Sequence, residues 1–293
     1  MEKVLFDTDI GNDIDDALAL AYLLSEKRCE LMGVTTTSGQ GALRAEMVSA
    51  ICHNAGRPEV PVHVGLPVPL YTEDLQPIAY QAAALKDWKR DSFGDTPTAI
   101  DFMHRVITEN PGEINLLSVG PMTNIGALFL AHPEVPRLLK SVILMCGLFF
   151  DSPGGENNAC CDPYATAAVY GNNFRERPVR HVSYGINVTR QVYLPREEAR
   201  KKLSGVKVLE PVADFAEVWF RTRERITFHD PLAAVGLFDP DVCKYKSGFV
   251  KVSLHAPTMG WTVFNSDSAE KPHLAASEVD PERFFKAYFS VVA

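Results

Sequence analysis

The stretch VLFDTDIGNDIDDALALAYLL, residues 4–24, joins a short apolar run to a longer apolar segment through a loop that is rich in aspartate. The apolar run at residues 4–6 is typical of a buried strand, and residues 17–24 have the length and apolar character of a packed helix. A strand followed directly by such a helix is the opening half of a parallel β-α-β unit. In sheets of this kind the ligand site lies beyond the carboxyl ends of the strands, which is where the aspartates fall.

The same alternation of strand and helix signals continues along the 293 residues. We expect strands at residues 4–6, 31–35, 62–64, 114–119, 142–146, 179–183, 249–254, 262–264 and 274–279. We expect helices at residues 17–24, 43–54, 98–108, 124–130, 164–170, 196–203 and 212–223, and from residue 281 onwards. Continuous apolar strands between helices indicate a mainly parallel sheet that is covered on both faces. The predicted fold is therefore α/β: one domain over residues 1–293, with a Rossmann-like sheet and a small β-containing C-terminal addition.

Composition and charge narrow the possible partners. Hydrophobic residues make up 46% of the chain and charged residues 23%, which is ordinary for a globular protein with a sizeable core. The formal net charge of −8 argues against nucleic acid or an anionic membrane as the main partner. We expect neither a signal peptide nor a membrane-spanning helix, because no apolar run approaches ~20 residues. The six cysteines form neither a CxxC pair nor a zinc-binding spacing, so we expect reduced thiols in a cytoplasmic protein.

The five aspartates of the opening loop need a partner. Two carboxylates ~4 Å apart repel each other by ~4 kcal/mol at an effective dielectric constant near 20. Asp15 and Asp16 could be explained as caps of the following helix, but Asp7, Asp9 and Asp13 could not. Several carboxylates together either take up protons or enclose a cation, and carboxylate oxygens without nearby His or Cys favour Ca²⁺ or Mg²⁺ over zinc. A bound cation is the leading interpretation, and a solvated acidic loop is the alternative.

Two known metal-binding patterns begin in a similar way. An EF-hand loop needs an acidic group at its fifth place, but a loop that starts at Asp7 has Gly11 there, so this interpretation fails. A Mg²⁺-dependent phosphatase of the haloacid-dehalogenase type also places the pattern DxD after its first strand. That family usually has Thr or Val where this chain has Gly11, so the match is weak. It still leaves Asp7 open as a phosphatase nucleophile.

Other stretches carry polar groups that could join the same site. The stretch HDP at residues 229–231 could start a helix with Asp at the N-cap, or could present a histidine and a carboxylate. Glu156 and Asn158 lie between a strand and a helix, where they could bind a polyol or hold the loop. Asp162-Pro163 is expected to be a structural helix cap. The turn GPMTN at residues 120–124 offers backbone carbonyls that could reach a metal ion.

Taken in order along the chain, these stretches resemble the inosine–uridine preferring nucleoside hydrolase family. The resemblance also covers GVTT at residues 33–36, VHVGLPVPL at 62–70, VGPMTNIGALFLAHPEV at 119–135, and residues 142–147 and 278–285. It implies a calcium-dependent enzyme that hydrolyses ribonucleosides to a free base and ribose. It also implies a Rossmann-like fold and assembly into a homodimer or homotetramer.

The resemblance implies roles for individual residues. The Ca²⁺ ligands would be Asp9, Asp16, Asp230 and the backbone carbonyl of Thr123. The positions that correspond to ribose contacts are Asp15, Gln40, Glu156 and Asn158. Asp9 would be the general base that takes a proton from the attacking water, and His229 would protonate or hydrogen-bond the departing base.

Three departures from the family pattern leave alternatives open. The pair Asp15-Asp16 follows Asp9 two residues later than is usual, so Asp13 is a second candidate for the base. Gln40 stands where the family often has an asparagine, and Phe150 stands where it often has another sugar-binding asparagine. These two changes keep open a non-catalytic nucleoside- or sugar-binding protein on the same fold. Aromatic residues that could stack on a purine, or pack in the core, are Trp88, Trp219, Trp261, Phe149 and Phe150.

Overall fold

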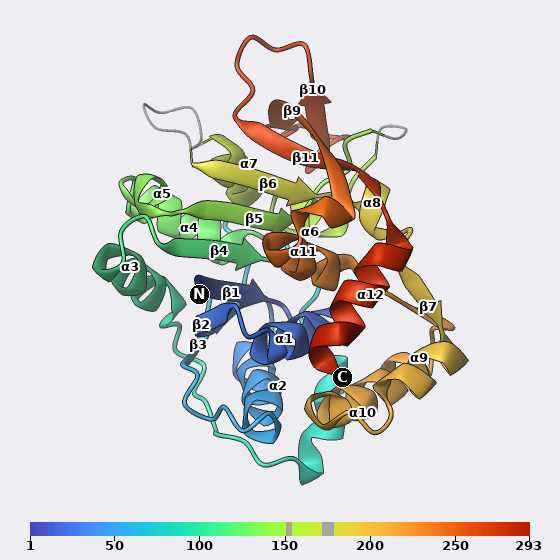
Figure 1. Cartoon of the computed structure of the whole chain (residues 1–293). Coiled ribbons are helices and arrows are strands. Elements are labelled where there is room, and N and C mark those ends of the chain that lie inside the picture. The colour runs from blue at the N-terminus through green and yellow to red at the C-terminus, as the bar shows by residue number, and fades with distance from the viewer. Residues whose placement is uncertain (151–153, 172–178) are drawn as a thin grey trace.

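The computed structural model describes residues 1–150, 154–171 and 179–293, apart from the side chain of Lys86. Its main feature is a nine-stranded sheet with the order β10-β9-β11-β6-β5-β4-β1-β2-β3 (Figure 1). The strands of this sheet are β1 (Glu2–Thr8), β2 (Cys29–Thr36), β3 (Val62–Val64), β4 (Ile114–Ser118), β5 (Ser141–Met145), β6 (Arg180–Tyr184), β9 (Cys243–Val252), β10 (Thr262–Asn265) and β11 (His273–Val279). Two short strands, β7 (Tyr193–Pro195) and β8 (Arg225–Thr227), form a separate antiparallel pair.

Helices cover the sheet and connect its strands. The α-helices are α1 (Asp15–Ser25), α2 (Gly41–Asn54), α3 (Ala99–Glu109), α4 (Thr123–Ala131), α5 (Val135–Leu138), α6 (Asn157–Cys161), α7 (Pro163–Gly171), α8 (Ile186–Thr189), α9 (Arg196–Leu203), α10 (Glu210–Trp219), α11 (His229–Phe238) and α12 (Pro281–Val292). The 3₁₀ helices are η1 (Tyr80–Asp87), η3 (Lys207–Leu209) and η4 (Pro240–Val242). No helix in the described ranges has both the length and the apolar character needed to span a membrane.

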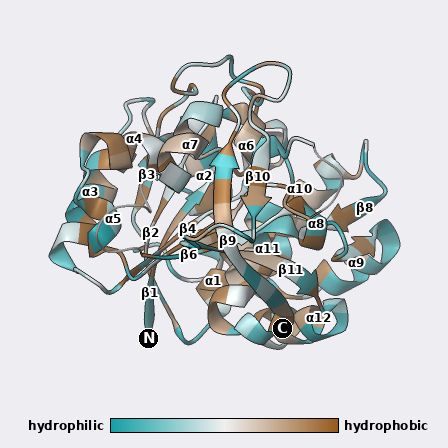
Figure 2. Cartoon of the chain, turned by 90° about the horizontal axis from the view of Figure 1, so that it is seen from above, coloured by the Kyte–Doolittle hydropathy of each residue, from teal (hydrophilic) through white to brown (hydrophobic). Residues whose placement is uncertain are grey.

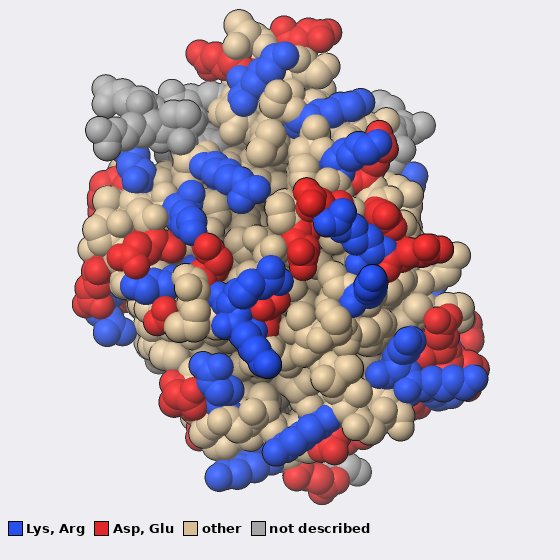
Figure 3. Space-filling model, in the orientation of Figure 1, with Lys and Arg blue, Asp and Glu red and all other residues tan. Residues whose placement is uncertain are grey.

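The two faces of the sheet bury two separate hydrophobic cores. Successive strand residues point to opposite faces, so Val4 and Phe6 of β1 belong to the core that includes α1, α2 and α11, whereas Leu5 belongs to the core that includes α3, α4 and α7. In Figure 2, hydrophobic residues (brown) accordingly lie mainly toward the middle of the molecule, and much of the outer loop structure is hydrophilic (teal). On the face shown in Figure 3, positive and negative side chains are interspersed.

The strand order places a topological switch point between β1 and β4. The chain runs outward from β1 to β2 and β3, and then returns to β4 on the other side of β1 before continuing to β5 and β6. All of these neighbouring pairs are parallel. Ligands bind at such a point because the connections leave the sheet in opposite directions and open a crevice at the carboxyl ends of the strands. The aspartate-rich loop leaves β1 at this crevice.

The predicted α/β class and the mainly parallel sheet are confirmed, and the C-terminal strands extend the same sheet. Strand β11 pairs with β6 in parallel, and β9 and β10 are antiparallel. Strand β9 begins at Cys243, six residues before the predicted 249–254. The missed half, CKYKSG, is largely polar because it lies at an exposed part of the sheet. Helix α10 ends at Trp219 and not at residue 223.

Three aspartates that the sequence placed at helix starts, Asp15, Asp16 and Asp230, lie in the first helical turn and not at the N-cap position. The N-cap of α1 is Ile14, so Asp15 and Asp16 belong to the first helical turn. The N-cap of α11 is Phe228, and neither cap makes a side-chain hydrogen bond. Asp230 is therefore inside the first turn of α11. Asp15 still accepts the backbone N–H of Asp230 at the start of α11, whereas the carboxylates of Asp16 and Asp230 are left for other partners.

Candidate active site

A cavity of about 270 Å³ opens at the switch point of the sheet. It lies at the carboxyl ends of the central strands, where α1, α6 and α11 begin and α10 ends. Its lining residues are Asp9, Asn12, Asp13, Asp15, Asp16, Gln76, Val119, Met145, Glu156, Asn157, Asn158, Ile186, Trp219, Arg223, His229 and Asp230. Most of the polar residues that the sequence indicated, from three distant parts of the chain, therefore face one space.

Three buried carboxylates form the centre of this cavity. Asp15, Asp16 and Asp230 each have an oxygen that lies within 4.8 Å of the oxygens of the other two. The backbone N–H of Asp230 donates to Asp15 Oδ2 at 3.2 Å, so the first turns of α1 and α11 meet here. The hydroxyl of Thr8 donates to Asp16 Oδ1 and orients that carboxylate. Asp9 lines the same cavity, although it is not one of the three convergent groups.

Burial and mutual repulsion raise the pKa values of these carboxyl groups. Burial is the main cause for Asp9, Asp13, Asp16 and Asp230, and it raises the pKa of Asp15 to about 7. Neighbouring negative charges raise the pKa values further, since a second charge nearby disfavours ionisation. A divalent cation would reverse this effect, because it favours the ionised forms. The donor atoms are all carboxylate oxygens, so the set fits a hard cation.

Asp7 is a structural residue of the sheet and does not line the cavity. It lies opposite Thr35 in β2 and Ser118 in β4, and both hydroxyls donate to its carboxylate, at 2.5 and 3.3 Å. Asn124 Nδ2 of α4 donates to the same carboxylate at 2.7 Å. Burial raises the pKa of Asp7 to about 7. A carboxylate that is enclosed in this way cannot attack a phosphate, so the structure disfavours the phosphatase alternative.

Two glycines allow the aspartate loop to fold tightly over the strand ends. Gly11 has a φ of +117°, a conformation that L side chains rarely adopt. A Cβ atom on Gly120, in the turn after β4, would lie 2.8 Å from Asp9 Oδ1 and 2.9 Å from the Asp9 nitrogen. The β4–α4 turn can therefore approach Asp9 only because residue 120 has no side chain.

The side chain of Arg44, which sequence reasoning did not single out, fixes the same loop by hydrogen bonds to its backbone. It is fully buried on α2. Its guanidinium donates to the backbone carbonyls of Asp9 and Ile10, to that of Ser38 at 2.8 Å, and to that of Gln76 at 2.7 Å. Its positive charge also opposes the rise in the pKa of Asp9. An arginine within the otherwise apolar face of a helix is the one sequence signal that could have revealed it.

Arg44→Met is expected to lower the free energy of unfolding by at least ~3 kcal/mol, since each buried carbonyl that loses its donor costs ~1–3 kcal/mol. The variant should also bind divalent cations more weakly, because the Asp9 segment is released. Urea unfolding and a calcium titration measure the two effects. Arg44→Lys is the matched control: it keeps the charge but has fewer donors, so its loss should be smaller. A fully stable Arg44→Met protein would contradict this account of the loop.

Glu156 and Asn158 are fixed at the edge of the cavity by backbone groups. Glu156 is the N-cap of α6 and accepts hydrogen bonds from the backbone N–H groups of Gly147, Asn158 and Ala159, at 2.9, 2.7 and 3.1 Å. Burial raises the pKa of Glu156, and these three bonds oppose the rise. Asn158 Nδ2 donates to the carbonyls of Val119 and Met145, at 2.5 and 3.0 Å. The Oδ1 of Asn158 remains as the amide atom that can meet a ligand.

The opposite wall of the cavity carries a histidine, a tryptophan and an arginine. His229 Nδ1 lies 2.7 Å from the Thr189 hydroxyl, which leaves Nε2 as the free ring nitrogen. Burial lowers the pKa of His229, and the nearby negative charge of Asp13 opposes this. The Arg223 guanidinium lies over the ring of Trp219, 5.3 Å from its centroid. Of the five aromatic candidates for stacking on a base, Trp219 is the one among the cavity-lining residues of the described chain.

Some residues singled out in the sequence lie outside the cavity lining. Gln40 is exposed, and its Oε1 accepts the backbone N–H of Ala79 at 3.0 Å. Phe150 packs against Phe149 and Phe264. Thr123 is buried beside the cavity, and its hydroxyl donates to Asp162 Oδ2 at 2.9 Å.

Asp162 is the structural helix cap that the sequence predicted. Its Oδ1 accepts the backbone N–H of Ala165 in the first turn of α7, at 2.9 Å. Neither Gln40 nor Phe150 is among the described residues that line the cavity, so these two positions do not place a side chain there. Sequence reasoning missed the neighbouring pair Asn12 and Gln76, whose amide groups hydrogen-bond each other at the cavity wall.

Fold and cavity together define a doubly wound α/β protein with a buried cluster of carboxylates, a candidate metal site, at its switch point. The family model described as inosine-uridine preferring nucleoside hydrolase matches residues 4–286. The chain is 28% identical over 284 residues to "Probable uridine nucleosidase 1" of Oryza sativa subsp. japonica, covering 90% of this chain and 85% of that protein. It is 26% identical over 278 residues to "Pyrimidine-specific ribonucleoside hydrolase RihA" of Citrobacter koseri, covering 89% of this chain and 87% of that protein.

Solved structures show the same fold. "Plant nucleoside hydrolase - PpNRh1 enzyme" superposes with a TM-score of 0.81 at 25% identity, over 99% of this chain and 98% of that one. "Purine-Preferring Ribonucleoside Hydrolase from Gardnerella vaginalis" superposes with a TM-score of 0.84 at 23% identity, over 99% and 98%. The chain belongs to the inosine–uridine preferring nucleoside hydrolase family. It is an N-glycosyl hydrolase that converts ribonucleosides to free base and ribose.

Proposed function

We propose that this nucleoside hydrolase depends on Ca²⁺, held in the cluster of buried aspartates. The observation that carries the proposal is the convergence of Asp15, Asp16 and Asp230 within 4.8 Å, with Asp9 facing the same cavity. An all-oxygen set of this kind favours Ca²⁺ because that ion accepts roughly six to eight oxygen ligands. By the family resemblance, Asp9, Asp16, Asp230 and the Thr123 carbonyl are the ligands, and Asp15 contacts the ribose hydroxyls.

The residues around the ion would divide the chemistry of hydrolysis among them. Bound Ca²⁺ would supply a Lewis acid that lowers the pKa of the attacking water and orients the ribose diol. Asp9 would take the proton of that water, with Asp13 as the alternative base. The bond between C1′ of the ribose and the base nitrogen would then break through an oxocarbenium-like transition state, as in glycoside hydrolysis. The surrounding carboxylates would stabilise the positive charge that develops on the sugar.

Substrate binding would use the wall of the cavity that carries Glu156 and Asn158 and the wall that carries Trp219 and Arg223. Glu156 and the Oδ1 of Asn158 would hydrogen-bond the ribose, since both groups are already fixed by the backbone around them. Trp219 and Arg223 would lie beside the base, where the indole offers a flat apolar surface and the guanidinium offers hydrogen-bond donors. The named relatives include enzymes described for pyrimidine and for purine nucleosides, so we propose no single preferred base.

His229→Ala should reduce hydrolysis of natural nucleosides much more than hydrolysis of a 4-nitrophenyl riboside. A natural base needs a proton or hydrogen bond to leave, and general-acid assistance is worth ~10²–10⁴-fold, whereas nitrophenolate leaves without help. Comparison of kcat/KM for the two substrate types in wild type and variant measures the difference. A control variant, Thr189→Val, removes the hydroxyl beside Nδ1 and should have a smaller effect of the same kind. Equal losses on both substrates would argue against leaving-group assistance by His229.

A panel of common nucleosides, assayed for release of reducing sugar with and without added calcium, tests the proposed function. We expect base and ribose to appear with at least one nucleoside, and only when calcium is present. Tight ribose binding without base release would instead favour a non-catalytic binding protein.

We also propose a cytoplasmic location and a homodimer or homotetramer. All six cysteines are free thiols in the structure, which is compatible with a reducing compartment. The oligomeric state rests on the family resemblance alone.

A further inference from the structure

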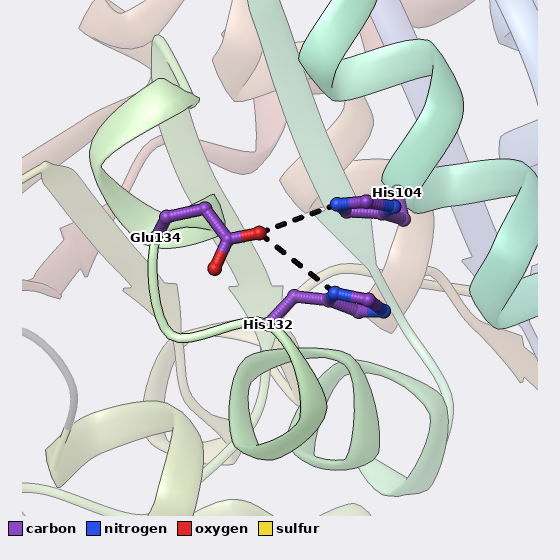
Figure 4. A group of neighbouring side chains, drawn as sticks. All are labelled: His104, His132 and Glu134. Atoms are coloured by element: carbon purple, nitrogen blue, oxygen red, sulfur yellow. Dashed lines mark hydrogen bonds and ion pairs between the residues drawn. The ribbon is translucent and has the colours of Figure 1, made fainter.

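Two histidines and a glutamate, residue types that can bind metal ions, come together on the surface near the C-terminal end of α4. His104 belongs to α3, His132 follows the last residue of α4, and Glu134 precedes the first residue of α5. Figure 4 shows both imidazole rings directed toward the same carboxylate oxygen. His104 Nε2 is 3.3 Å from Glu134 Oε1, and His132 Nδ1 is 3.8 Å from it. One ligand atom from each residue lies within 4.8 Å of those of the other two.

The two imidazoles lie face to face. Their ring centroids are 3.7 Å apart and the angle between their planes is 12°. A neutral imidazole nitrogen is the form of histidine that binds metal ions. The stack also turns both nitrogens toward the same side, where the carboxylate already lies.

Packing holds the three residues in place while leaving them accessible. Phe102 and Met103, which directly precede His104 on α3, are buried in the same core as Phe129 of α4 and Val135 of α5. The backbone positions of the three residues are therefore fixed by one core. Their side chains remain 32%, 29% and 54% exposed for His104, His132 and Glu134, so an ion and its water ligands can reach them.

We propose that His104, His132 and Glu134 bind a divalent transition-metal ion, with Zn²⁺ as the preferred ion and water completing its coordination. Two imidazole nitrogens and one carboxylate oxygen are a typical donor set for Zn²⁺ and a poor one for Ca²⁺, so the site is chemically distinct from the aspartate cluster. Because Zn²⁺–ligand bonds are ~2.1 Å long, the three exposed side chains must rotate about their torsion angles to bring their ligand atoms closer together. The bound ion would tie α3 to the turn between α4 and α5.

This site should affect stability and leave catalysis unchanged. The nine residues of α4 separate His132 from Thr123 by ~13 Å, at 1.5 Å of rise per residue. An ion that binds only the folded protein stabilises it by mass action. The expected result is therefore a higher melting temperature with Zn²⁺ and unaltered hydrolysis of nucleosides by the calcium-loaded enzyme.

Calorimetric titration of the calcium-saturated enzyme with Zn²⁺ tests the proposal, because calcium blocks the aspartate cluster. Wild type should bind one equivalent of Zn²⁺ and gain thermal stability. His104→Ala and His132→Ala should each weaken Zn²⁺ binding by more than ~10-fold, and Glu134→Gln should weaken it without removing a side chain from the surface. His53→Ala is the matched control, because His53 lies 3.2 Å from the single carboxylate of Asp91 and has no second histidine in that pair.

Two outcomes would overturn the proposal. One is the absence of any Zn²⁺ binding to the calcium-saturated wild type. The other is Zn²⁺ binding that survives in the double variant H104A/H132A with unchanged affinity. Retained nucleoside hydrolysis by each variant shows that it is folded, so a loss of Zn²⁺ binding in an active variant is attributable to the missing ligand.

Discussion

Removal of calcium is expected to abolish the release of base and ribose from nucleosides. Asp15, Asp16 and Asp230 place three carboxylate oxygens within 4.8 Å of one another in a buried site. Without a cation these groups repel one another or retain protons, and neither state can orient the ribose diol and the attacking water. Reducing-sugar release should therefore fall to background after treatment with a strong calcium chelator and recover when excess calcium is added.

A second measurement, the pH dependence of the free energy of unfolding with and without calcium, separates the effect of the metal from general damage by the chelator. In the calcium-free protein, the folded-state pKa of Asp15 is raised to about 7, above the ~3.9 of an unfolded chain. The folded state then holds a proton that the unfolded state has released, so the free energy of unfolding should fall as the pH rises from about 4 to about 7. Calcium should flatten this slope because it replaces the protons. Full turnover in the presence of the chelator would remove the metal from the mechanism.

Asp9→Asn is expected to lower kcat by ~10²–10⁴-fold, the usual contribution of a general base. Asp9 faces the cavity beside the three convergent carboxylates, and Arg44 and Gly120 fix its position. The amide keeps the size and much of the hydrogen bonding of the carboxylate but cannot accept a proton from water. Steady-state kinetics with the best nucleoside of the panel would measure the loss, and KM should change far less than kcat.

The matched variant for this test is Asp13→Asn. Asp13 is less buried than Asp9 and lies near His229, on which its charge acts. We expect its replacement to affect kcat less than that of Asp9. Because Asp9 is proposed as a calcium ligand as well as the base, a calcium titration of both variants comes first. The values of kcat are then compared at saturating calcium, so that weaker calcium binding in Asp9→Asn is not mistaken for loss of the base. A larger loss of kcat in Asp13→Asn would assign the base to the residue that the longer loop introduces.

Much of the fold follows from local sequence. The apolar runs of β1, β4 and β5 are continuous because both faces of these strands are buried, and this pattern is readable in one dimension. The same holds for α1, which is apolar on all sides because it packs between the sheet and α11. Strand β9 was recognised only in part, because its first half carries lysines and a serine at exposed positions. Its place in the sheet depends on pairing with β11, which lies more than twenty residues away.

The residues of the site could be predicted from the sequence only where residue type or a motif pointed to them. Asp9, Asp16 and Asp230 could be singled out because a family resemblance covers their motifs, and carboxylates crowded together imply a cation. Arg44 gave no such signal, since its role depends on four backbone carbonyls from three separate segments. Asp7 and Asp9 are two residues apart, so they would point to the same face of a continuing strand. Strand β1 ends at Thr8, however, so Asp7 stays within the sheet and accepts a hydrogen bond from Asn124 of α4, whereas Asp9 lies in the loop that lines the cavity.

The sequence by itself determined the α/β class, the position of the acidic loop after the first strand and the presence there of crowded carboxylates. These properties depend on residue type and on short-range periodicity, which the chain carries locally. Tertiary structure decided which aspartates share a cavity, which one is part of the sheet, and that two histidines and a glutamate from α3, α4 and α5 meet on the surface. Those outcomes depend on the order of the strands and the crossing of the helices, because only the packed chain brings groups 30 to 215 residues apart within a few ångströms.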